Sequence, residues 1–420
     1  MTASIRGSPA PCLMQTSTAS APLPATTNSA AGTRQILGFV YFTFIVYLSV
    51  GLPLAVLPPY VHLRMGYSAA LAGLVISFQY IATFASRPWA GRISDRAGAK
   101  VSVLWGMIGC SLSGAMLIAA ALLHATPWLS LTALFASRLL LGVGESLGST
   151  GATLWGISSA GQSNTARVIS FNGISTYGAM ALGAPLGVVV AGRWGLAAIG
   201  LLILLIGAIS FILASRKSPV TVTHGQHLPF SHVAGRVAPH GMALALGGIG
   251  SSVLSTFVTL FYLSRHWDGA ALCLTAFGLA FVAARLLFMR AINRFGGFPV
   301  TIACFTVESA GLLLLWRAPS PSMAFAAAAL TGFGFSLVFP ALGVEAVKRV
   351  AIQNRGSALG IFTAFIDVSF FLTGPLAGAV IGLWGYSSAF LFALGCVLLA
   401  LGIVLVLKHF DSQPGLTGRG

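Results

Sequence analysis

Long apolar stretches alternate with short polar breaks along nearly the whole chain after residue 34. A helix needs about 20 apolar residues to cross a hydrocarbon core of roughly 30 Å, because it rises about 1.5 Å per residue. Twelve stretches reach this length, and we predict that each forms a transmembrane helix. They are residues 36–58, 68–90, 101–123, 129–157, 167–192, 195–215, 240–264, 271–290, 298–316, 322–347, 357–382 and 385–407.

The composition excludes a soluble globular protein. Hydrophobic residues make up 56% of the 420 positions and charged residues only 7%, whereas soluble domains carry roughly 25% charged residues. Residues 1–34 are rich in Ser, Thr, Ala and Pro and lack the apolar core of a signal peptide. They are therefore predicted to be a disordered cytoplasmic tail, and residues 409–420 a second, shorter tail.

The basic residues indicate the orientation of the chain in the membrane. The net charge is +16. If both termini are cytoplasmic, nearly every Lys and Arg falls on the inner side, including Arg87 and Arg285 at helix ends, and this is the positive-inside pattern. The basic side chains on the outer side are Arg64, Arg193, Arg265 and Arg317. The charge therefore predicts a multi-pass protein of the bacterial inner membrane with both termini cytoplasmic, and not a nucleic-acid-binding protein.

The longest polar break divides the twelve stretches into six and six. It covers residues 216–239 and contains Arg, Lys, His, Pro and Ser without an apolar span. We predict an N-terminal half at residues 35–215, a cytoplasmic linker at 216–239 and a C-terminal half at 240–408.

An internal repeat supports this division. The polar decapeptide Gly91–Lys100 (GRISDRAGAK) returns in a weaker form 198 positions later. The matched residues are Arg87, Asp95, Arg96 and Gly98 in the first copy and Arg285, Asn293, Arg294 and Gly296 in the second. A second match, at an offset of 190, relates Pro185 to Pro375. Two parallel repeats of six helices are typical of a transporter whose substrate site lies near the midplane between the halves.

These motifs resemble those of the major facilitator superfamily, and the resemblance covers nearly everything after residue 34. GRISDRAGAK is similar to the loop motif G-x-x-x-D-R-x-G-x-[KR] of that family. Arg138 followed by Gly142 and Gly144 is similar to a second motif in the fourth span. The resemblance is closest to the bacterial branch of arabinose-efflux-like permeases, a family label that carries no evidence about the substrate. It implies an all-α membrane protein with twelve transmembrane helices in two parallel six-helix repeats.

A third motif concerns the direction of transport. GAMALGAPLG in the fifth span resembles the motif of exporters and antiporters, although Ala184 and Val188 stand where that motif has glycines. GPLAG in the eleventh span is a better match. The prolines are predicted to kink their helices, and the small residues to permit close helix contacts. The residues of this helix-kink motif are Gly183, Pro185 and Gly187 in one half and Gly374, Pro375 and Gly378 in the other.

The decapeptide is predicted to be a conformational latch between the halves. Gly91 would let the chain approach a neighbouring helix, and Gly98 would permit the turn between spans. The carboxylate of Asp95 is favourable near the positive N-terminal end of a helix, which the resemblance identifies as the eleventh span, starting near Gly356. The alternative is a merely polar short loop.

The rest of the latch depends on charge. Arg96 would need an acidic partner, for which Glu145 is a candidate. In the second copy Asn293 replaces the aspartate before Arg294, so the latch is expected to be weaker there.

Four of the seven acidic residues fall within predicted spans, where an ionised carboxylate costs several kcal/mol or more. Asp367 has no basic residue in its own span, and burial without a partner favours a protonated carboxyl. It is a candidate for proton coupling or a hydrogen-bonded structural residue. Glu308 is a further coupling candidate, although a structural role is favoured in the ninth span. Glu345, beside Lys348 and Arg349, is predicted to form an interfacial ion pair.

Arg138 and Glu145 are predicted to share one face of the fourth span. They are seven residues apart, which is close to two helical turns and about 10 Å along the axis. Either Arg138 orients a substrate or tunes a proton-carrying Glu145, or the two residues tie helices of one half together. Four other polar residues are candidates for the substrate cavity or, alternatively, for helix–helix hydrogen bonds: Gln79, Tyr80, Asn172 and Tyr177.

The leading functional prediction is a secondary active transporter that exports a small organic solute by alternating access, driven by proton antiport. The alternatives are a proton-coupled importer on the same fold and a membrane sensor that does not transport. GESLG (Gly144–Gly148) matches a hydrolase elbow only by letters, because it lies inside a span and not on a strand–turn–helix. No enzyme activity, cofactor, metal or nucleic acid is predicted, and the expected partners of a monomeric chain are solute, protons and lipid.

Overall fold

The structure is a computed structural model that describes Thr2 and residues 29–161, 164–220, 230–288, 290–350 and 355–411. Every regular element in these ranges is a helix. Twelve helices or broken helices are long and apolar enough to cross a membrane. The predicted number and order of spans are therefore confirmed.

The first half contains six spans. Span one is built from α1 (Ser29–Leu54), α2 (Leu57–Pro59) and the π-helix η1 (Tyr60–Arg64). The others are α3 (Ala69–Arg96), α4 (Ala99–Leu122, extended by the 3-10 helix η2, Leu123–Ala125), α5 (Pro127–Ala160), α6 (Thr165–Trp194) and α7 (Leu196–Arg216).

The second half also contains six spans. Its helices are α8 (Phe230–Ser264), α9 (Ala270–Leu287), α10 (Ala291–Phe295), α11 (Gly297–Arg317), α12 (Pro321–Phe335), α13 (Val338–Lys348), α14 (Arg355–Trp384) and α15 (Ser388–Asp411). The fourth of these spans is broken into α12 and α13, and the short helix α10 lies between two spans. The helices α1 and α8 begin before the boundaries predicted at residues 35 and 240, and α15 continues past residue 408. Apart from Thr2 and residues 217–220, the remaining parts of the tails and the linker lie outside the described residues.

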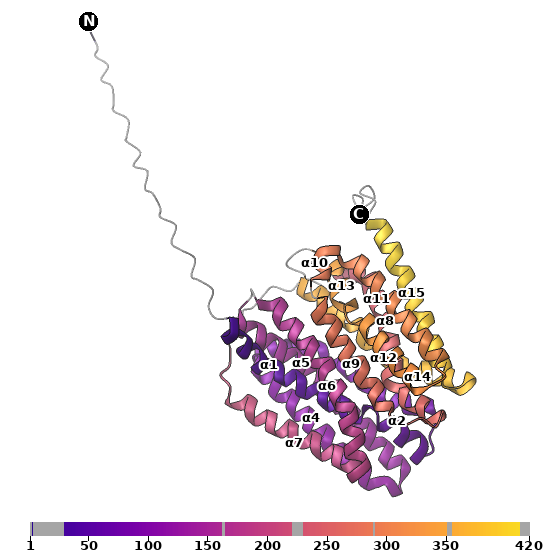
Figure 1. Cartoon of the computed structure of the whole chain (residues 1–420). Helices are drawn as coiled ribbons and strands as arrows, with labels where there is room; N and C mark the ends of the chain where they lie inside the picture. Colours follow the sequence, from indigo (N-terminus) through magenta and orange to yellow (C-terminus); the bar gives the residue numbers. More distant parts are fainter. Residues whose placement is uncertain are drawn as a thin grey trace.

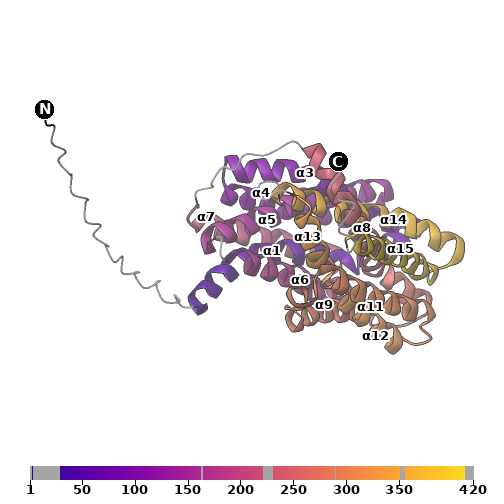
Figure 2. The ribbon, with the colours of Figure 1, turned by 90° about the horizontal axis from the view of Figure 1, so that it is seen from above.

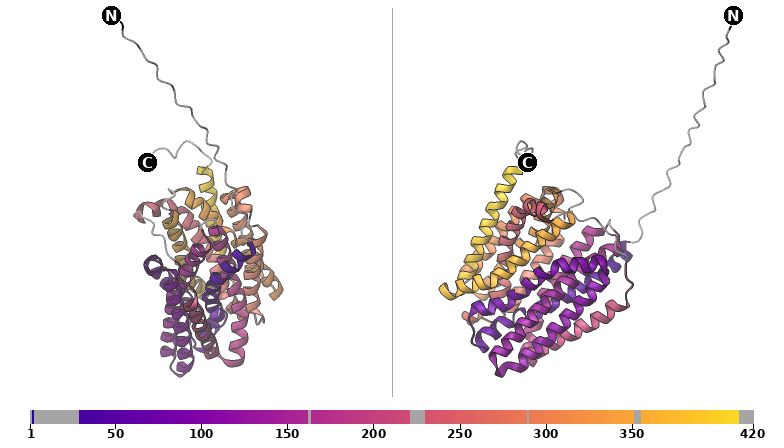
Figure 3. Two further views of the ribbon diagram at one scale, coloured as in Figure 1. Left: turned by 90° about the vertical axis from the view of Figure 1, so that its left-hand side faces the viewer. Right: turned by 180° about the vertical axis from the view of Figure 1, so that it is seen from behind.

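The two halves lie side by side along their lengths (Figures 1 and 2). Contacts between them are made mainly by α3 with α14 and by α6 with α9. The helices α4 and α7 form one flank of the bundle, and α11, α12 and α15 lie toward the other, as the views in Figure 3 also show. The interface between the halves therefore presents α1, α3, α5 and α6 to α8, α9 and α14.

Two spans are interrupted just before prolines that do not belong to the helix-kink motif. A proline has no N–H to donate to the carbonyl four residues earlier. Accordingly, α1 ends at Leu54, four residues before Pro58, and α12 ends at Phe335, just before the carbonyl that Pro340 leaves free. By contrast, α6 and α14 continue through Pro185 and Pro375.

In α6 a neighbouring helix replaces the missing bond. The Ala181 carbonyl, which Pro185 leaves free, accepts a hydrogen bond of 2.9 Å from the Thr275 hydroxyl of α9. A side chain from another helix thus satisfies the carbonyl that the proline frees, as a helix inside a membrane requires. Because Thr275 belongs to the other half, this bond also joins the two halves.

Glycines of the motif lie at close helix contacts, as predicted. A Cβ on Gly73 of α3 would meet the backbone of Gly374 of α14, and a Cβ on Gly374 would meet Gly73. Gly378 faces the backbone of Ala70 in the same way. These contacts hold α3 against α14 near the end of the bundle opposite the one that carries the termini.

The glycines of the motif in α6 make contacts within the first half only. Gly183 and Gly187 lie against the α1 backbone at Gly51 and Leu52. The two copies of the motif therefore differ in what they hold together.

The decapeptide loop confirms one glycine prediction and corrects another. Gly98 has φ +97°, and its counterpart Gly296 has φ +85°, so both supply the left-handed turn before the next span. Gly91 makes no close helix contact, because α3 continues to Arg96 and no atom of the described residues lies within 4 Å of a Cβ at Gly91. Asp95 is half-buried.

The latch itself remains a prediction. Asp95 is predicted to lie near the N-terminal end of the eleventh span, which α14 begins at Arg355, and the side chains at that end lie outside the described residues. Arg96, Asn293 and Arg294 are exposed at the same end of the bundle.

Candidate transport cavity

A cavity of about 620 Å³ lies between the two halves. Its wall extends from Leu54, at the break in the first span, to Ile157, Ile169 and Gly360, near the end of the bundle that carries the termini. This volume lies within the range of typical small-molecule sites, roughly 300–1,000 Å³. The interface between the halves therefore contains a space suited to a small organic solute.

The wall combines hydroxyl groups with aromatic rings. Its hydroxyl side chains, tyrosines apart, are Thr43, Ser149, Thr150, Thr153, Thr176, Ser251, Ser252, Ser255, Thr256 and Thr363. Its aromatic side chains are Tyr47, Tyr80, Tyr177, Phe277, Phe281, Phe335, Phe339 and Phe370. The charged residues of the wall are Arg87 and Glu145 from the first half and Arg285 and Asp367 from the second.

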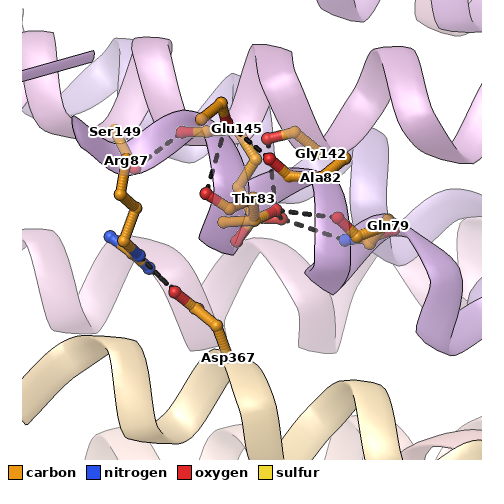
Figure 4. A network of polar contacts seen from close by, with 9 residues as sticks. Gln79, Ala82, Thr83, Arg87, Gly142, Glu145, Ser149 and Asp367 are labelled. Carbon is orange, nitrogen blue, oxygen red and sulfur yellow. Dashed lines mark hydrogen bonds and ion pairs between the residues drawn. The ribbon is translucent and has the colours of Figure 1, made fainter. Parts of the chain in front are cut away.

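Arg87 of α3 and Asp367 of α14 form an ion pair between the halves (Figure 4). Arg87 Nε donates to one carboxylate oxygen, and Nη2 donates to the other at 2.9 Å. The side chains are 23% and 5% exposed. The expectation that Asp367 lacks a basic partner is therefore wrong. The attraction between the two charges offsets part of the free energy that their burial costs. The partner of Asp367 comes from another helix, 280 positions away in sequence.

Glu145 of α5 lies near this pair but is bound by other residues (Figure 4). One carboxylate oxygen accepts hydrogen bonds from Gln79 Nε2 at 3.0 Å and from Thr83 Oγ1 at 3.3 Å, both from α3. Arg96 is exposed at the end of α3 and is not the partner of Glu145, which corrects that part of the latch prediction.

Gln79 connects Glu145 to Arg138. The side-chain oxygen Oε1 of Gln79 accepts a hydrogen bond from Arg138 Nη1 at 3.4 Å, while its side-chain Nε2 donates to Glu145. Arg138 and Gln79 are 1% and 2% exposed and do not line the cavity. They therefore do not line this cavity, and Arg138 and Glu145 are joined through Gln79 of α3 within the first half and not by a direct ion pair among the described residues.

The structure places the other predicted cavity polars in the wall. Tyr80 and Tyr177 both line it; the Tyr80 ring lies 5.0 Å from that of Phe370, and the Tyr177 ring is stacked on Phe281 at 3.6 Å. Asn172 also lines it, but its amide accepts from Thr43 at 2.7 Å and donates to Thr153 at 2.9 Å. Asn172 thus fits both of its predicted roles.

The two remaining membrane acids lie away from the cavity. Glu308 is fully buried against α8 and α12, beside Gly250 and Gly334, and neither carboxylate oxygen has a hydrogen-bond partner among the described residues. Glu345 pairs with Lys348 at 2.9 Å and accepts from the first backbone N–H of α11, Gly297, at 2.8 Å. The predicted interfacial ion pair is confirmed.

Arg87 and Arg285 are the site residues that the sequence reading missed. Both were assigned to the inner membrane surface because they lie at the ends of apolar stretches. The internal repeat could have identified them. It matches Arg87 with Arg285 although both lie before the decapeptide, at positions where the loop motif does not require arginine.

A second link between the halves lies at the end of the bundle opposite the termini. His62 Nδ1 lies 2.6 Å from the Tyr67 carbonyl, and Nε2 lies 2.9 Å from the Tyr386 hydroxyl. Because a carbonyl only accepts, Nδ1 carries the hydrogen and Nε2 accepts from Tyr386. Burial raises the pKa of Tyr386, and its neutral hydroxyl is the donor in this bond.

A twelve-span bundle of two halves with a polar cavity at their interface defines a membrane transporter scaffold. The profile of the Major Facilitator Superfamily matches residues 39–272 and 241–418. The chain belongs to this superfamily.

Relatives agree with this assignment. The chain is 53% identical over 396 residues to an "uncharacterized MFS-type transporter" of Pseudomonas aeruginosa (strain UCBPP-PA14), covering 94% of this chain and 98% of that protein. It is 50% identical over 398 residues to another from Burkholderia pseudomallei (strain 1106a), covering 95% and 97%. Its relatives are thus transporters.

Solved structures share the fold. The nucleoside transporter NupG has a TM-score of 0.69 and 16% identity, with 90% of this chain and 99% of that chain covered. The human organic anion transporter MFSD10 has a TM-score of 0.68 and 16% identity, with 89% and 99% covered. At this identity the likeness concerns the fold alone.

Proposed function

We propose that this transporter exports a small organic solute from the cytoplasm in exchange for protons across the bacterial inner membrane. The observation that carries the proposal is the Arg87–Asp367 ion pair, which joins the two halves and faces the cavity. Glu145, in the wall formed by the first half, supplies a second carboxylate that reaches the same space.

The ion pair connects protonation to the position of the halves. Alternating access moves one half against the other around the central site, and this motion must alter the contact between α3 and α14. When Asp367 takes up a proton, Arg87 loses its counter-ion and the contact between the halves weakens. Proton binding and movement are thereby coupled at one pair of side chains.

We assign the conformation as inward-facing. The positive-inside pattern places the end of the bundle that carries the termini in the cytoplasm. The cavity wall reaches that end at Ile157, Ile169 and Gly360. At the opposite end, the Gly73–Gly374 contact and the His62–Tyr386 bond join the halves.

Export is the proposed direction because GPLAG in α14, and less completely GAPLG in α6, resemble exporter motifs. A proton-coupled importer is the second candidate, since the fifth-span motif lacks two of its glycines. The two directions use the same cavity and carboxylates, so only the sign of coupled flux separates them.

The test begins with a resistance screen in an efflux-deficient host, which supplies solutes for transport assays. The purified chain is then placed in proteoliposomes with an imposed pH gradient. We expect solute to move opposite to the proton gradient. Flux independent of the gradient would contradict proton coupling, and solute movement in the same direction as protons would favour the importer.

Three variants assign the coupling residue. Asp367→Asn and Glu145→Gln remove one carboxylate each, and Asp411→Asn removes an exposed acid outside the cavity as the matched control. We expect at least one cavity variant to lose gradient-driven flux while keeping gradient-independent exchange of solute, and the control to behave as the unaltered chain. Full gradient-driven flux in both cavity variants would refute the carboxylate assignment.

A further inference from the structure

We propose that the transported solute is an organic anion and that Arg285 binds its acidic group. This inference rests on the proposed transport function and names the substrate class for the same cavity. It is carried by three observations: the surroundings of the Arg285 guanidinium, its position in the internal repeat, and the side chains beside it.

Among the described residues, the Arg285 guanidinium has a hydrogen-bond acceptor but no counter-ion. Nη2 donates to the Ser336 carbonyl at 2.8 Å, and the guanidinium lies 5.1 Å above the Phe281 ring. Nε is buried without a hydrogen-bond partner among the described residues, and none of their ion pairs includes Arg285. The negative end of the α9 dipole and one carbonyl offset only part of a full positive charge.

A glycine in the other half leaves room for the Arg285 guanidinium. Gly173 of α6 faces Arg285, and a Cβ at Gly173 would overlap Nη1. Both residues line the cavity. Arg285 is thus held across the interface with its unpaired face available to a ligand.

The internal repeat shows which group is missing. Arg87 corresponds to Arg285 at the 198-residue offset, and Asp367 corresponds to Tyr177 at the 190-residue offset that also relates Pro185 to Pro375. In one copy the arginine faces an aspartate across the interface. In the other copy the equivalent position is a tyrosine, which cannot neutralise the charge. The protein therefore supplies the anion to Arg87 but leaves that of Arg285 to come from the cavity.

The other cavity carboxylates do not fill this role. Asp367 is engaged by two donors of Arg87, and Glu145 accepts from Gln79 and Thr83 on α3. An anionic ligand beside Arg285 would give that guanidinium its charge partner without disturbing either arrangement. A cationic ligand would add to an uncompensated charge.

The neighbours of Arg285 suit the rest of such a ligand. Tyr177 and Phe281 present a stacked pair of rings next to the guanidinium, and Phe277 and Phe335 continue the aromatic surface. The hydroxyls of Ser251, Ser252 and Ser255 on α8 also line the cavity. The chemistry fits an acid attached to a flat apolar body. Exchange of an anion for incoming protons also moves positive charge inward, so the membrane potential would assist export.

The test measures binding of a matched panel to the full chain in lipid nanodiscs by calorimetry at neutral pH. The probes are benzoate, benzyl alcohol and benzylamine, which share a ring and differ in charge. We expect benzoate to bind most tightly, by roughly tenfold to a hundredfold over the alcohol, as a hydrogen bond to a charged group implies. Equal binding of the three probes, or preference for the amine, would overturn the inference.

Variants then locate the preference. Arg285→Gln is expected to abolish it, and Arg285→Lys to keep part of it, because the charge remains without the forked geometry. Gly173→Ala removes the space for Nη1 without changing any charge, and should reduce the preference even if Arg285→Gln does not fold. Arg290→Gln, which removes an exposed charge just beyond α9, is the control. A benzoate preference retained in Arg285→Gln would also overturn the inference.

The binding test and the flux test distinguish failure of the anion site from failure of the proposed proton coupling. Proton-driven flux without any preference for benzoate would refute the anion site and leave the proposed function intact. Benzoate preference lost in Arg285→Gln, together with flux that ignores the pH gradient, would leave the anion site and refute the proton coupling.

Discussion

Removing one member of the Arg87–Asp367 pair is expected to destabilise the protein more than removing both. Asp367→Asn has nearly the same shape but leaves the Arg87 guanidinium without a counter-ion, and Arg87→Gln leaves the carboxylate of Asp367 in the same state. Breaking a fully buried pair costs about 3–5 kcal/mol. Because the Arg87 side chain is 23% exposed to the cavity, we expect each single variant to lose about 2–3 kcal/mol of unfolding free energy.

The double variant isolates the interaction. With both charges gone, two amides face each other and no uncompensated charge remains, so we expect a loss of only about 1 kcal/mol. The sum of the two single losses would then exceed the loss in the double variant by several kcal/mol, which is far beyond the roughly 0.5 kcal/mol expected of independent sites.

The measurement is unfolding of the purified chain in mixed micelles with increasing denaturing detergent, followed by circular dichroism. Arg349→Gln and Asp411→Asn form the matched cycle, because this pair is more exposed, at 32% and 53%, and lies outside the cavity. We expect its coupling to stay below about 1 kcal/mol. If the losses in the Arg87–Asp367 cycle are additive, so that its coupling free energy is no larger than that of the control cycle, this pair is not the charge link between the halves.

Two further predictions concern the buried Gln79 bridge and the link between the halves at the end of the bundle opposite the termini. Gln79→Leu should lower the unfolding free energy by about 1–3 kcal/mol in the same detergent titration, because Arg138 and Glu145 both lose a buried hydrogen-bond partner; stability equal to the unaltered chain would contradict the bridging role. Tyr386→Phe removes the donor to His62 and should raise the outward-open population roughly twofold to tenfold, the equivalent of one neutral hydrogen bond. Accessibility of a cysteine placed at Tyr67 to an impermeant reagent measures this change, and an unaltered labelling rate would contradict a closing role for the bond.

The sequence predicted the helices well because their signal is local. Each span needs only its own length and apolar composition, and Gly98 and Gly296 fix their turns by their own φ angles. The positions of the membrane acids followed from the same local pattern. What each acid contacts did not follow, because it depends on the rotation of two helices distant in sequence.

Asp367 shows this limit. Its partner lies on α3, and no feature of the eleventh span alone indicates Arg87. For Arg138 and Glu145 the spacing predicted a common face correctly, but only the packing of α3 against α5 shows that Gln79 fills the distance. The prolines give the same lesson: the helices before Pro58 and Pro340 end, whereas α6 and α14 continue through Pro185 and Pro375. A neighbour on the freed carbonyl does not decide this, because the carbonyls of Ala181 and Ser336 both accept a hydrogen bond from α9.

The break in the tenth span gives Arg285 a mechanical connection. Pro340 cannot donate to the Ser336 carbonyl, and Arg285 donates to it instead, while the Ser336 hydroxyl donates to the Phe281 carbonyl at 2.6 Å. The guanidinium is therefore tethered to the one point where α12 and α13 can pivot. A change in the angle between α12 and α13 would displace the Arg285 guanidinium. Solute binding and the conformation of the tenth span would therefore change together.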